Sequence, residues 1–296
     1  SVNLTRSDSC RVVGNRMDKS IQKDASSTDN FIKANVFTGT LMKVLQISNE
    51  TSSDFTWDEA VRDLYWCKGS GTWNDPYLFE DMSFTLDEKE LNYALNLKDV
   101  RKPFIIRNVS FIPPKDNNFP AIYCENVHNG TLEKNNLTGK YQPGLKIFQS
   151  SNLTLVDNEF LNNLESAIYL KDCWNISIEK NHIKACYKGM AFSGSVNNTI
   201  SGNTIEECDY FNSPAIFLNS GSKNNTFYNN YLSANWQNAK DDGVSNRWNN
   251  SEIGNYWSNY TGTDESPVDG IGDTPHPIPG SASSLDFLPI WDGAPP

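Results

Sequence analysis

The stretch that decides the fold runs from residue 167 to residue 208 and reads AIYLKDCWNISIEKNHIKACYKGMAFSGSVNNTISGNTIEEC. Its two halves can be laid over each other, because Ala167 and Gly189 are both followed by apolar residues one and three positions later. Apolar residues two apart lie on one face of a β-strand. The same pattern opens five segments, with spacings of 23, 23, 22 and 26 residues, at Ala121, Gly144, Ala167, Gly189 and Ala215.

The second part of each segment carries two further apolar columns with an asparagine between them. Asparagine is unusually common, at 37 of 296 residues. A turn asparagine stacked on another can pass side-chain hydrogen bonds along the column and satisfy turn amides that would otherwise be buried without partners. The repeat therefore predicts a structural asparagine ladder made of Asn135, Asn158, Asn181, Asn203 and Asn230.

Units of 22 to 26 residues are too short to bury both faces of their strands alone. Coils stacked about 4.8 Å apart pair each strand with the next and bury one continuous core. We therefore expect an all-β fold, a right-handed parallel β-helix built as a single-stranded solenoid with N-terminal and C-terminal caps. A leucine-rich horseshoe is disfavoured, because the LxxLxL spacing is absent. A β-sandwich would not place two apolar columns and an asparagine column in one register.

The pattern divides the chain into three regions. Residues 1–60 show no repeat and are expected to form an N-terminal cap or assembly segment that covers unpaired strand edges. Residues 61–235 are expected to form the coils. Residues 236–296 are expected to hold the last coil and a C-terminal cap rich in aromatic residues, glycine and proline.

Charge and hydropathy exclude several classes of function. The chain has 25 basic and 36 acidic residues and a net charge of −11. This charge balance argues against nucleic acids and anionic membranes as partners, because both require a cationic surface. No apolar run approaches the roughly 18 residues of a membrane span. We expect no nucleic-acid partner and no membrane insertion in this chain.

Three motifs carry a family resemblance. GTWNDPY (71–77), NNTISGN (197–203) and IGNYWSNYTGTD (253–264) followed by DGIGDTP (269–275) resemble secreted archaeal proteins of the broad NosD-like, pectin-lyase-like group. The resemblance covers roughly residues 54 to 292 and implies an extracellular right-handed β-helix, secreted or at the cell surface. It implies little about chemistry, because this fold hosts lyases, hydrolases, adhesins and binders.

Metal sites are considered from the ligand types. Carboxylates clustered in a glycine-containing loop suit Ca²⁺, and the loop favours a calcium site at Asp264, Glu265, Asp269 and Asp273. The alternative is a polar cap loop whose aspartates cap turns.

Copper is implied by the NosD name and needs His, Cys and Met. No copper is expected, because the three histidines are scattered, at His128, His182 and His276.

Six cysteines in a chain of secreted type suggest disulfides. Cys186 and Cys208 each stand three residues after an isoleucine of the same column, so they take equivalent places on neighbouring coils. That spacing predicts a disulfide between them. The pairing of the other cysteines stays open; they are Cys10, Cys67, Cys124 and Cys173.

The Asn-x-Ser/Thr pattern marks N-glycosylation acceptors, although asparagine-rich turns also create it by composition. Four of these sequons recur just before the second strand, on a turn expected to be exposed, at Asn152, Asn175, Asn197 and Asn224. We expect them to form a stripe of glycans. The other sequons begin at Asn3, Asn49, Asn108, Asn129, Asn136, Asn249 and Asn259.

Outward positions of the first strand carry aromatic rings that can stack on sugars, unless a neighbouring loop covers them. These positions are Tyr123, Lys146, Tyr169, Ala191 and Phe217. Adjacent coils also place Glu159 beside His182 and Asp157 beside Lys180, as acid–base pairs. A solvated face of mixed charge shows such pairs by default, so no catalytic residue is assigned.

These observations predict an extracellular surface or structural β-helix protein that is adhesive or glycan-binding and N-glycosylated. Its expected partners are glycans, other surface proteins or further copies of itself. Two alternatives stay open. One is a polysaccharide lyase or glycoside hydrolase. The other is a subunit of an extracellular filament, formed by end-to-end stacking or by a donated strand.

Overall fold

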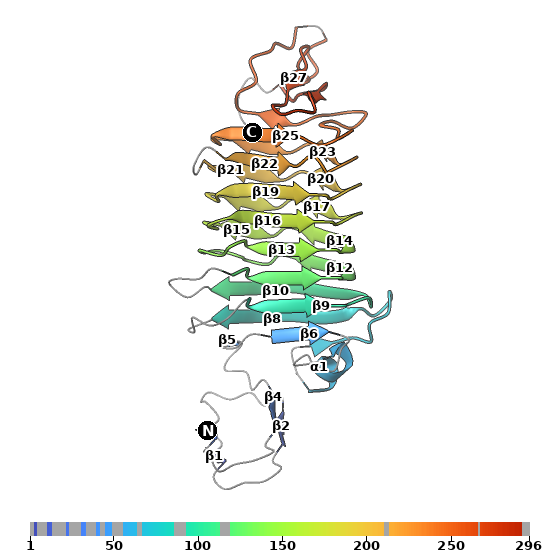
Figure 1. The fold of residues 1–296 in the computed structure, drawn as a ribbon, viewed down its shortest axis with the longest axis vertical. Coiled ribbons are helices and arrows are strands. Elements are labelled where there is room, and N and C mark those ends of the chain that lie inside the picture. The colour runs from blue at the N-terminus through green and yellow to red at the C-terminus, as the bar shows by residue number, and fades with distance from the viewer. Residues whose placement is uncertain are drawn as a thin grey trace.

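The computed structural model describes most of the chain beyond residue 55 and several short strands before it. The longer described stretches are residues 56–63, 67–85, 93–112, 119–209, 213–265 and 267–291. Their strands form a parallel β-solenoid in which successive coils are stacked along one axis (Figure 1). The predicted parallel β-helix is thereby confirmed.

The first sheet takes one strand from each coil. Its strands pair in parallel in chain order. They are β6 (Leu45–Ser48), β9 (Leu95–Lys98), β11 (Ile122–Glu125), β13 (Leu145–Phe148), β16 (Ser166–Lys171), β19 (Lys188–Ser193), β22 (Pro214–Leu218) and β25 (Gln237–Asp241).

The second sheet stacks in the same way. Its members are β5 (Thr40–Leu41), β8 (Tyr77–Thr85), β10 (Phe104–Ile112), β12 (His128–Glu133), β14 (Ser151–Val156), β17 (Ser177–Glu179), β20 (Thr199–Ser201) and β23 (Thr226–Tyr228), with β7 (Cys67–Lys68) antiparallel to β8. The third sheet holds β15 (Glu159–Leu161), β18 (His182–Lys184), β21 (Thr204–Glu206), β24 (Tyr231–Ser233) and β26 (Tyr256–Trp257).

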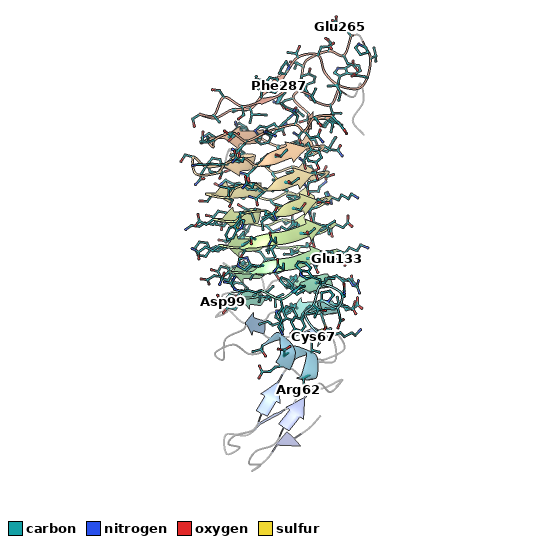
Figure 2. All side chains as sticks on the ribbon, turned by 90° about the vertical axis from the view of Figure 1, so that its right-hand side faces the viewer. Arg62, Cys67, Asp99, Glu133, Glu265 and Phe287 are labelled. Carbon is teal, nitrogen blue, oxygen red and sulfur yellow. The ribbon has the colours of Figure 1, made fainter. Side chains whose placement is uncertain are left out.

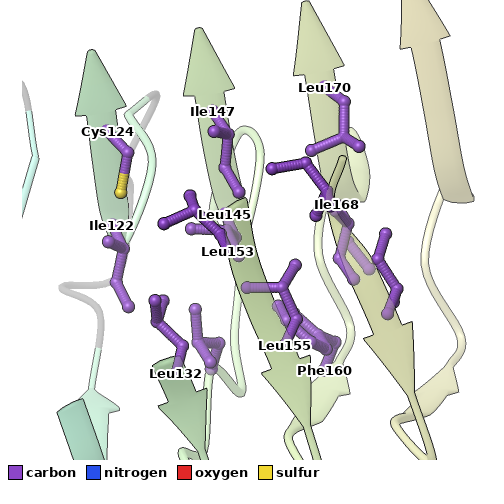
Figure 3. Close-up of a cluster of buried hydrophobic side chains, with 14 of the residues drawn as sticks. Ile122, Cys124, Leu132, Leu145, Ile147, Leu153, Leu155, Phe160, Ile168 and Leu170 are labelled. Carbon is purple, nitrogen blue, oxygen red and sulfur yellow. The ribbon is translucent and has the colours of Figure 1, made fainter. Parts of the chain in front are cut away.

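The core is a set of rows in which equivalent apolar residues lie on one another. Ile122, Leu145 and Ile168 form one row of paired residues, and all are 1% exposed or less (Figure 3). Fully burying such a side chain contributes about 1.5–3 kcal/mol. The rows explain why one short unit repeats: each coil buries its apolar face only against its neighbours.

The N-terminal end of the stack begins earlier than the predicted boundary at residue 61, because β5 and β6 already pair within the two larger sheets. The helix α1 (Trp57–Asp63) follows. Thr56 and Glu59 cap it reciprocally, through Glu59 N to Thr56 Oγ1 at 3.2 Å and Thr56 N to Glu59 Oε2 at 2.9 Å. Buried Trp57 stacks on Tyr77 with centroids 5.1 Å apart, so α1 covers this end.

Four further strands lie nearer the N-terminus, in two parallel pairs: β1 (Asn3–Leu4) with β3 (Gln22–Lys23), and β2 (Arg11–Val13) with β4 (Phe31–Lys33). The rest of the region expected to be a cap or assembly segment lies outside the described residues. At the other end, β27 (His276–Pro277) and β28 (Leu285–Asp286) form an antiparallel hairpin over the last coil. No helix in the described part of the chain is long and apolar enough to cross a membrane.

Candidate functional site

An outward column runs along the first sheet at the positions expected for sugar binding. Tyr123, Lys146 and Tyr169 are paired residue by residue on β11, β13 and β16. Ala191 and Phe217 continue the column on β19 and β22. The rings of this column are half-buried, and Ala191, between Tyr169 and Phe217, is buried.

The lysine of this column lies between two rings. Lys146 Nζ is 5.9 Å from the ring centroid of Tyr123 and 6.0 Å from that of Tyr169. An ammonium group at this distance from a ring face is attracted by the ring quadrupole, by about 0.5–1 kcal/mol at exposed sites. The Lys146 ammonium group is thus attracted by rings on both neighbouring coils.

The same contact recurs elsewhere on this sheet. Lys171 Nζ lies 5.2 Å from the ring centroid of Phe148, and Lys240 Nζ lies 5.6 Å from that of Phe217. Lysines and rings thus lie together on β11, β13 and β16 and again on β22 and β25, and Ala191 of β19 separates the two groups. We call this surface the lysine–aromatic face, made of Tyr123, Lys146, Phe148, Tyr169, Lys171, Phe217 and Lys240.

The lysine–aromatic face is cationic although the whole chain has a net charge of −11. Lys240 is paired with Asp242, with 2.6 Å between Nζ and Oδ2. Among the described residues, no carboxylate oxygen lies within 4.0 Å of the ammonium group of Lys146 or Lys171. These two groups can each form charge-assisted hydrogen bonds to a carboxylate or sulfate of a ligand.

Tyr123 keeps its proton over the physiological range. Burial, helped by the nearby Glu125 carboxylate, raises the pKa of Tyr123 to about 12. Its hydroxyl donates to Glu125 Oε2 at 3.4 Å. The phenol therefore remains neutral, and its ring offers an apolar surface with a polar edge, which suits the mixed surface of a sugar.

A cavity of about 530 Å³ flanks this face at the start of the first-sheet strands. Its lining residues lie in the connections before β13, β16, β19 and β22 and include Lys140, Asn162, Tyr187, Glu207 and Asp209. Both signs of charge occur in it, so it adds a polar recess beside the rings.

The predicted asparagine ladder is present in the structure. Asn135 Nδ2 donates to Asn158 Oδ1 over 3.0 Å, and the same bond runs from Asn158 to Asn181 (2.9 Å), Asn181 to Asn203 (3.0 Å) and Asn203 to Asn230 (2.9 Å). Each Nδ2 also donates to a carbonyl of the preceding coil, as Asn181 does to Leu155 O at 2.9 Å. All five side chains are buried. The ladder thus satisfies polar groups inside the corner between the second and third sheets.

The ladder continues beyond the repeat. Asn230 Nδ2 donates to Asn255 Oδ1 at 2.8 Å, and Asn255 donates in turn to Asp286 Oδ2, from its backbone N at 2.7 Å and from Nδ2 at 3.3 Å. Trp257 Nε1 donates to the same oxygen at 2.8 Å. Burial raises the pKa of the fully buried Asp286, against the opposing effect of these hydrogen bonds.

A second ladder occupies the corner between the first and second sheets, and the sequence reasoning missed it. Asn198 Nδ2 donates to Asn225 Oδ1 at 2.8 Å, and Asn225 Nδ2 donates to Asn246 Oδ1 at 3.0 Å. Asn246 Nδ2 then donates to buried Asp241 Oδ1 at 2.9 Å. The Asn-Asn pairs at residues 197–198 and 224–225 are the signal that pointed to it.

The expected disulfide is not formed. Cys186 and Cys208 do take equivalent places on neighbouring coils, two residues past the paired Lys184 and Glu206. Both are buried free thiols, like the other described cysteines, Cys67, Cys124 and Cys173. Cys186 Sγ donates to Lys184 O at 3.3 Å. The column therefore brings the pair together as core thiols, and Cys10 lies outside the described residues.

Three of the four carboxylates of the expected calcium loop accept hydrogen bonds from backbone amides, and the fourth, Glu265, accepts from the Thr263 hydroxyl at 3.4 Å. Asp264 Oδ2 accepts from Gly270 N at 2.8 Å, Asp269 Oδ1 from Ile271 N at 3.0 Å, and Asp273 Oδ2 from Glu265 N at 2.8 Å. In the described stretches no three His, Cys, Asp or Glu side chains converge on a point where a metal ion would sit. Figure 2 shows Glu265 in the loop at the far C-terminal end. The turn-capping alternative fits this geometry, and calcium binding stays a prediction of the sequence.

The three histidines lie apart. His128 Nδ1 is 2.7 Å from Ser151 Oγ, and burial, helped by the charge of Arg101, lowers its pKa. His182 lies on the third sheet, and His276 stacks on Trp257 at 4.7 Å in the C-terminal hairpin.

The acid–base pair expected on the third sheet belongs to a larger exposed network. His182 Nδ1 is 3.9 Å from Glu159 Oε1, and His182 Nε2 is 3.2 Å from Glu206 Oε1. Lys184 Nζ is 3.0 Å from the same Glu206 oxygen. Asp157 and Lys180 are both exposed turn residues with positive φ. These side chains lie on the solvated outer surface, so they fit a charge-mixed face.

Of the sequons outside the expected stripe, Asn129 extends the stripe by one coil, and the others are scattered. Asn136 is half-buried and donates to Glu159 Oε2 at 2.9 Å, and half-buried Asn249 donates to Asn250 O at 2.7 Å. Asn108 and Asn259 are exposed at other corners. The side chains of Asn3 and Asn49 lie outside the described residues.

Comparison with known proteins gives one family and a few relatives. The family model described as "Periplasmic copper-binding protein (NosD)" matches residues 92–262, more than half of the chain.

A cell surface glycoprotein of Methanothermus fervidus is 32% identical over 127 residues, which are 39% of this chain and 21% of that protein. The chain thus spans about a fifth of the length of this relative.

Two solved structures from Azotobacter vinelandii are similar in fold. The A-module of the mannuronan C-5 epimerase AlgE6 has a TM-score of 0.36 at 12% identity, covering 87% of this chain and 80% of that one. The A-module of AlgE4 has a TM-score of 0.27 at 11% identity, covering 58% and 78%.

Proposed function

The chain belongs to the NosD family, and on that premise we propose that it is an extracellular, N-glycosylated surface β-helix that binds acidic glycans through the lysine–aromatic face. The relative from Methanothermus fervidus is named a cell surface glycoprotein, which supports secretion to the cell surface. There the face meets the polysaccharides of its own cell or of its surroundings.

The observation that carries the proposal is the position of Lys146 between the rings of Tyr123 and Tyr169. Rings at regular intervals can stack on the apolar faces of sugars, and an ammonium group between them can bind an acidic substituent. A neutral glycan would use the rings alone. Unpaired ammonium groups on a chain of net charge −11 therefore favour a glycan with carboxylate or sulfate groups.

The face runs along the axis of the solenoid, so an extended polymer can contact several coils at once. Successive contacts of one polymer become intramolecular after the first, which raises the overall affinity above that of any single contact. A long polyanion is thus expected to bind more tightly than its short fragments.

The family description names copper, and the described residues do not fit a copper site. Copper favours clustered imidazole and sulfur ligands. His128, His182 and His276 lie in three separate surroundings, and the described cysteines are spread through the core. No step of the proposed function passes through a metal.

Affinity gel electrophoresis tests the proposal, with a polyuronate in one gel and a neutral glucan in another. We expect retardation by the polyuronate that weakens with added salt. Lys146→Gln and Tyr169→Ala should each weaken binding about tenfold, or ~1.4 kcal/mol. Lys180→Gln is the matched control, because it removes the same charge from an exposed corner outside the face.

Equal retardation of Lys146→Gln and Lys180→Gln would remove the face from the proposal. Binding of the neutral glucan alone would keep glycan binding and remove the acidic ligand. A lack of retardation in either gel would overturn glycan binding altogether.

A further inference from the structure

Five sequons stand on five consecutive coils at one corner of the solenoid. Their hydroxyl residues pair directly in the second sheet, Thr131 with Thr154, Thr154 with Ser177, Ser177 with Thr199, and Thr199 with Thr226. Two residues before each hydroxyl stands the acceptor asparagine. We call this set the sequon column: Asn129, Asn152, Asn175, Asn197 and Asn224.

All five acceptors share one backbone conformation. Their φ angles lie between 53° and 62°, in the left-handed region that asparagine tolerates better than most residues. The next residue points into the core, and the hydroxyl residue points outward, half-buried. Four of the acceptors are exposed, and Asn129 is half-buried. The turn therefore presents the amide and its hydroxyl to solvent in the same way on every coil.

The column differs in this respect from the sequons at Asn136 and Asn249. Those two acceptors are half-buried, and their Nδ2 atoms donate to Glu159 Oε2 and Asn250 O. Within the column, Asn175 Nδ2 donates to Asn152 Oδ1 at 2.6 Å, and Asn152 Nδ2 donates to Asn129 Oδ1 at 3.1 Å. Each such bond uses one amide hydrogen and leaves the second directed away from it.

We propose that the sequon column is the main N-glycosylation site and that glycans occupy alternate coils, never two neighbouring coils of one molecule. This inference rests on the proposed N-glycosylated surface protein and says which asparagines carry its glycans.

The co-reactant is an oligosaccharide linked through a phosphate to a lipid. Asparagine Nδ2 bonds to the anomeric carbon, the bond from that carbon to the phosphate oxygen breaks, and the lipid phosphate leaves with the electron pair. The displaced amide proton passes to solvent.

The exclusion follows from spacing. Paired strands lie about 4.7–4.9 Å apart, so neighbouring acceptors are about one strand spacing apart. A branched, hydrated glycan is bulky compared with that distance. Two coils separate alternate acceptors by roughly 9–10 Å. Of five acceptors in a row, at most three can then be occupied together, at Asn129, Asn175 and Asn224.

The chain offers a direct measurement of co-occupancy. Cleavage after arginine, at Arg107 and Arg247, releases the whole column on one fragment, because no arginine lies between them. Ser110→Ala and Thr138→Ala remove the two other sequons of that fragment, at Asn108 and Asn136. Two variants are then made in this background and expressed in an N-glycosylating host, each with Asn→Gln at three of the five acceptors. One variant keeps the neighbouring acceptors Asn152 and Asn175. The other keeps the alternate acceptors Asn152 and Asn197.

Mass spectrometry of the fragment counts the glycans. We expect one glycan at most on the neighbouring pair, and molecules with two on the alternate pair. Two glycans on the neighbouring pair would overturn this inference and leave the proposed function intact. The same holds if neither pair is modified while other sequons are. A native protein without any N-glycan would also overturn glycosylation in the proposed function. Neither outcome affects glycan binding, which the gel assay measures separately.

Discussion

At the scale of single residues, the two asparagine ladders end in the same way. Each asparagine donates to the oxygen of the next one, so the last asparagine of a row needs an acceptor that has no hydrogens of its own. Asp286 fills that position for Asn255, and Asp241 fills it for Asn246. Each carboxylate also accepts an indole N–H, from Trp257 and Trp248. Both oxygens of each buried carboxyl group thereby accept hydrogen bonds.

Replacing Asp286 tests its role as the final acceptor of the ladder that ends at Asn255. Asp286→Ala removes the acceptor of Asn255 N, Asn255 Nδ2 and Trp257 Nε1, and leaves them buried without partners. We expect the free energy of unfolding to fall by about 2–4 kcal/mol, measured by urea denaturation. Glu165→Ala, at an exposed carboxylate, is the control and should change it by less than ~0.5 kcal/mol. Equal effects of the two changes would contradict the assigned role.

How far single residues can be predicted depends on whether the repeat reaches them. Asn181 was predictable, because four equivalent asparagines stand in the same column. Asp286 was not, because it lies 31 residues beyond Asn255 and outside any repeat. The register placed Cys186 beside Cys208 correctly, but register alone does not determine whether two thiols are oxidised. The sequence grouped the carboxylates of the calcium loop, and the hydrogen bond from Gly270 N to Asp264 depends on a loop conformation that no repeat specifies.

At the scale of elements, the C-terminal hairpin closes the stack. β27 carries His276, which is 7% exposed and lies against Trp257 of β26. Burial lowers the pKa of His276 to about 4. The ring is therefore neutral when the hairpin is docked, and protonation opposes docking.

This hairpin makes stability depend on pH in a known direction. A histidine whose pKa falls from about 6.5 to about 4 on folding binds its proton more tightly in the unfolded chain. Stability is then lost as the pH falls from about 6.5 to about 4, by on the order of 2–3 kcal/mol. His276→Phe keeps the stacking and removes this titration. Urea unfolding at pH 7 and pH 4 should show the smaller loss in the variant; an equal loss would exclude His276 as the cause.

The strands of the coils and the elements of the caps differ in how well they can be predicted from the sequence. The strands of the coils were predictable, because their apolar columns repeat with a small residue before each. The short helix α1 is signalled by Thr56 and Glu59 three residues apart. The β27–β28 pairing has no such signal, because His276 and Leu285 belong to a single irregular loop.

At the scale of the whole molecule, the coils are interchangeable units. Each contacts its two neighbours, and its stability is set by those two interfaces. The coil between Ala167 and Lys188 has 22 residues, and Ser166 pairs with Lys188 in the first sheet. Removing that coil would bring Asn158 against Asn203 and keep every column in register.

We therefore expect deletion of residues 167–188 to leave a folded, shorter solenoid. Its circular dichroism should stay β-type, with one cooperative transition at a lower Tm. Deletion of residues 178–188 is the control, because it removes most of β17 and all of β18 and joins Ser177 of the second sheet to Gly189 of the first. A shortened chain that fails to fold in both cases would show that the coils are not interchangeable.

The lysine–aromatic face depends on the same stacking, so the sequence predicts which of its residues are paired but not how far apart their side chains lie. The pairing of Tyr123 with Lys146 follows from the repeat and was predictable. The distance from Lys146 to two rings at once depends on side-chain packing and was not.

The ladders also make the molecule directional. Every side-chain amide in a ladder has its N–H toward the later coil and its oxygen toward the earlier one, so the small dipoles add head to tail. The positive pole is already neutralised by a carboxylate at the C-terminal end. An additional rung arriving there would find no donor to receive it. Two such molecules therefore cannot be joined at this end through hydrogen bonds between their ladder asparagines.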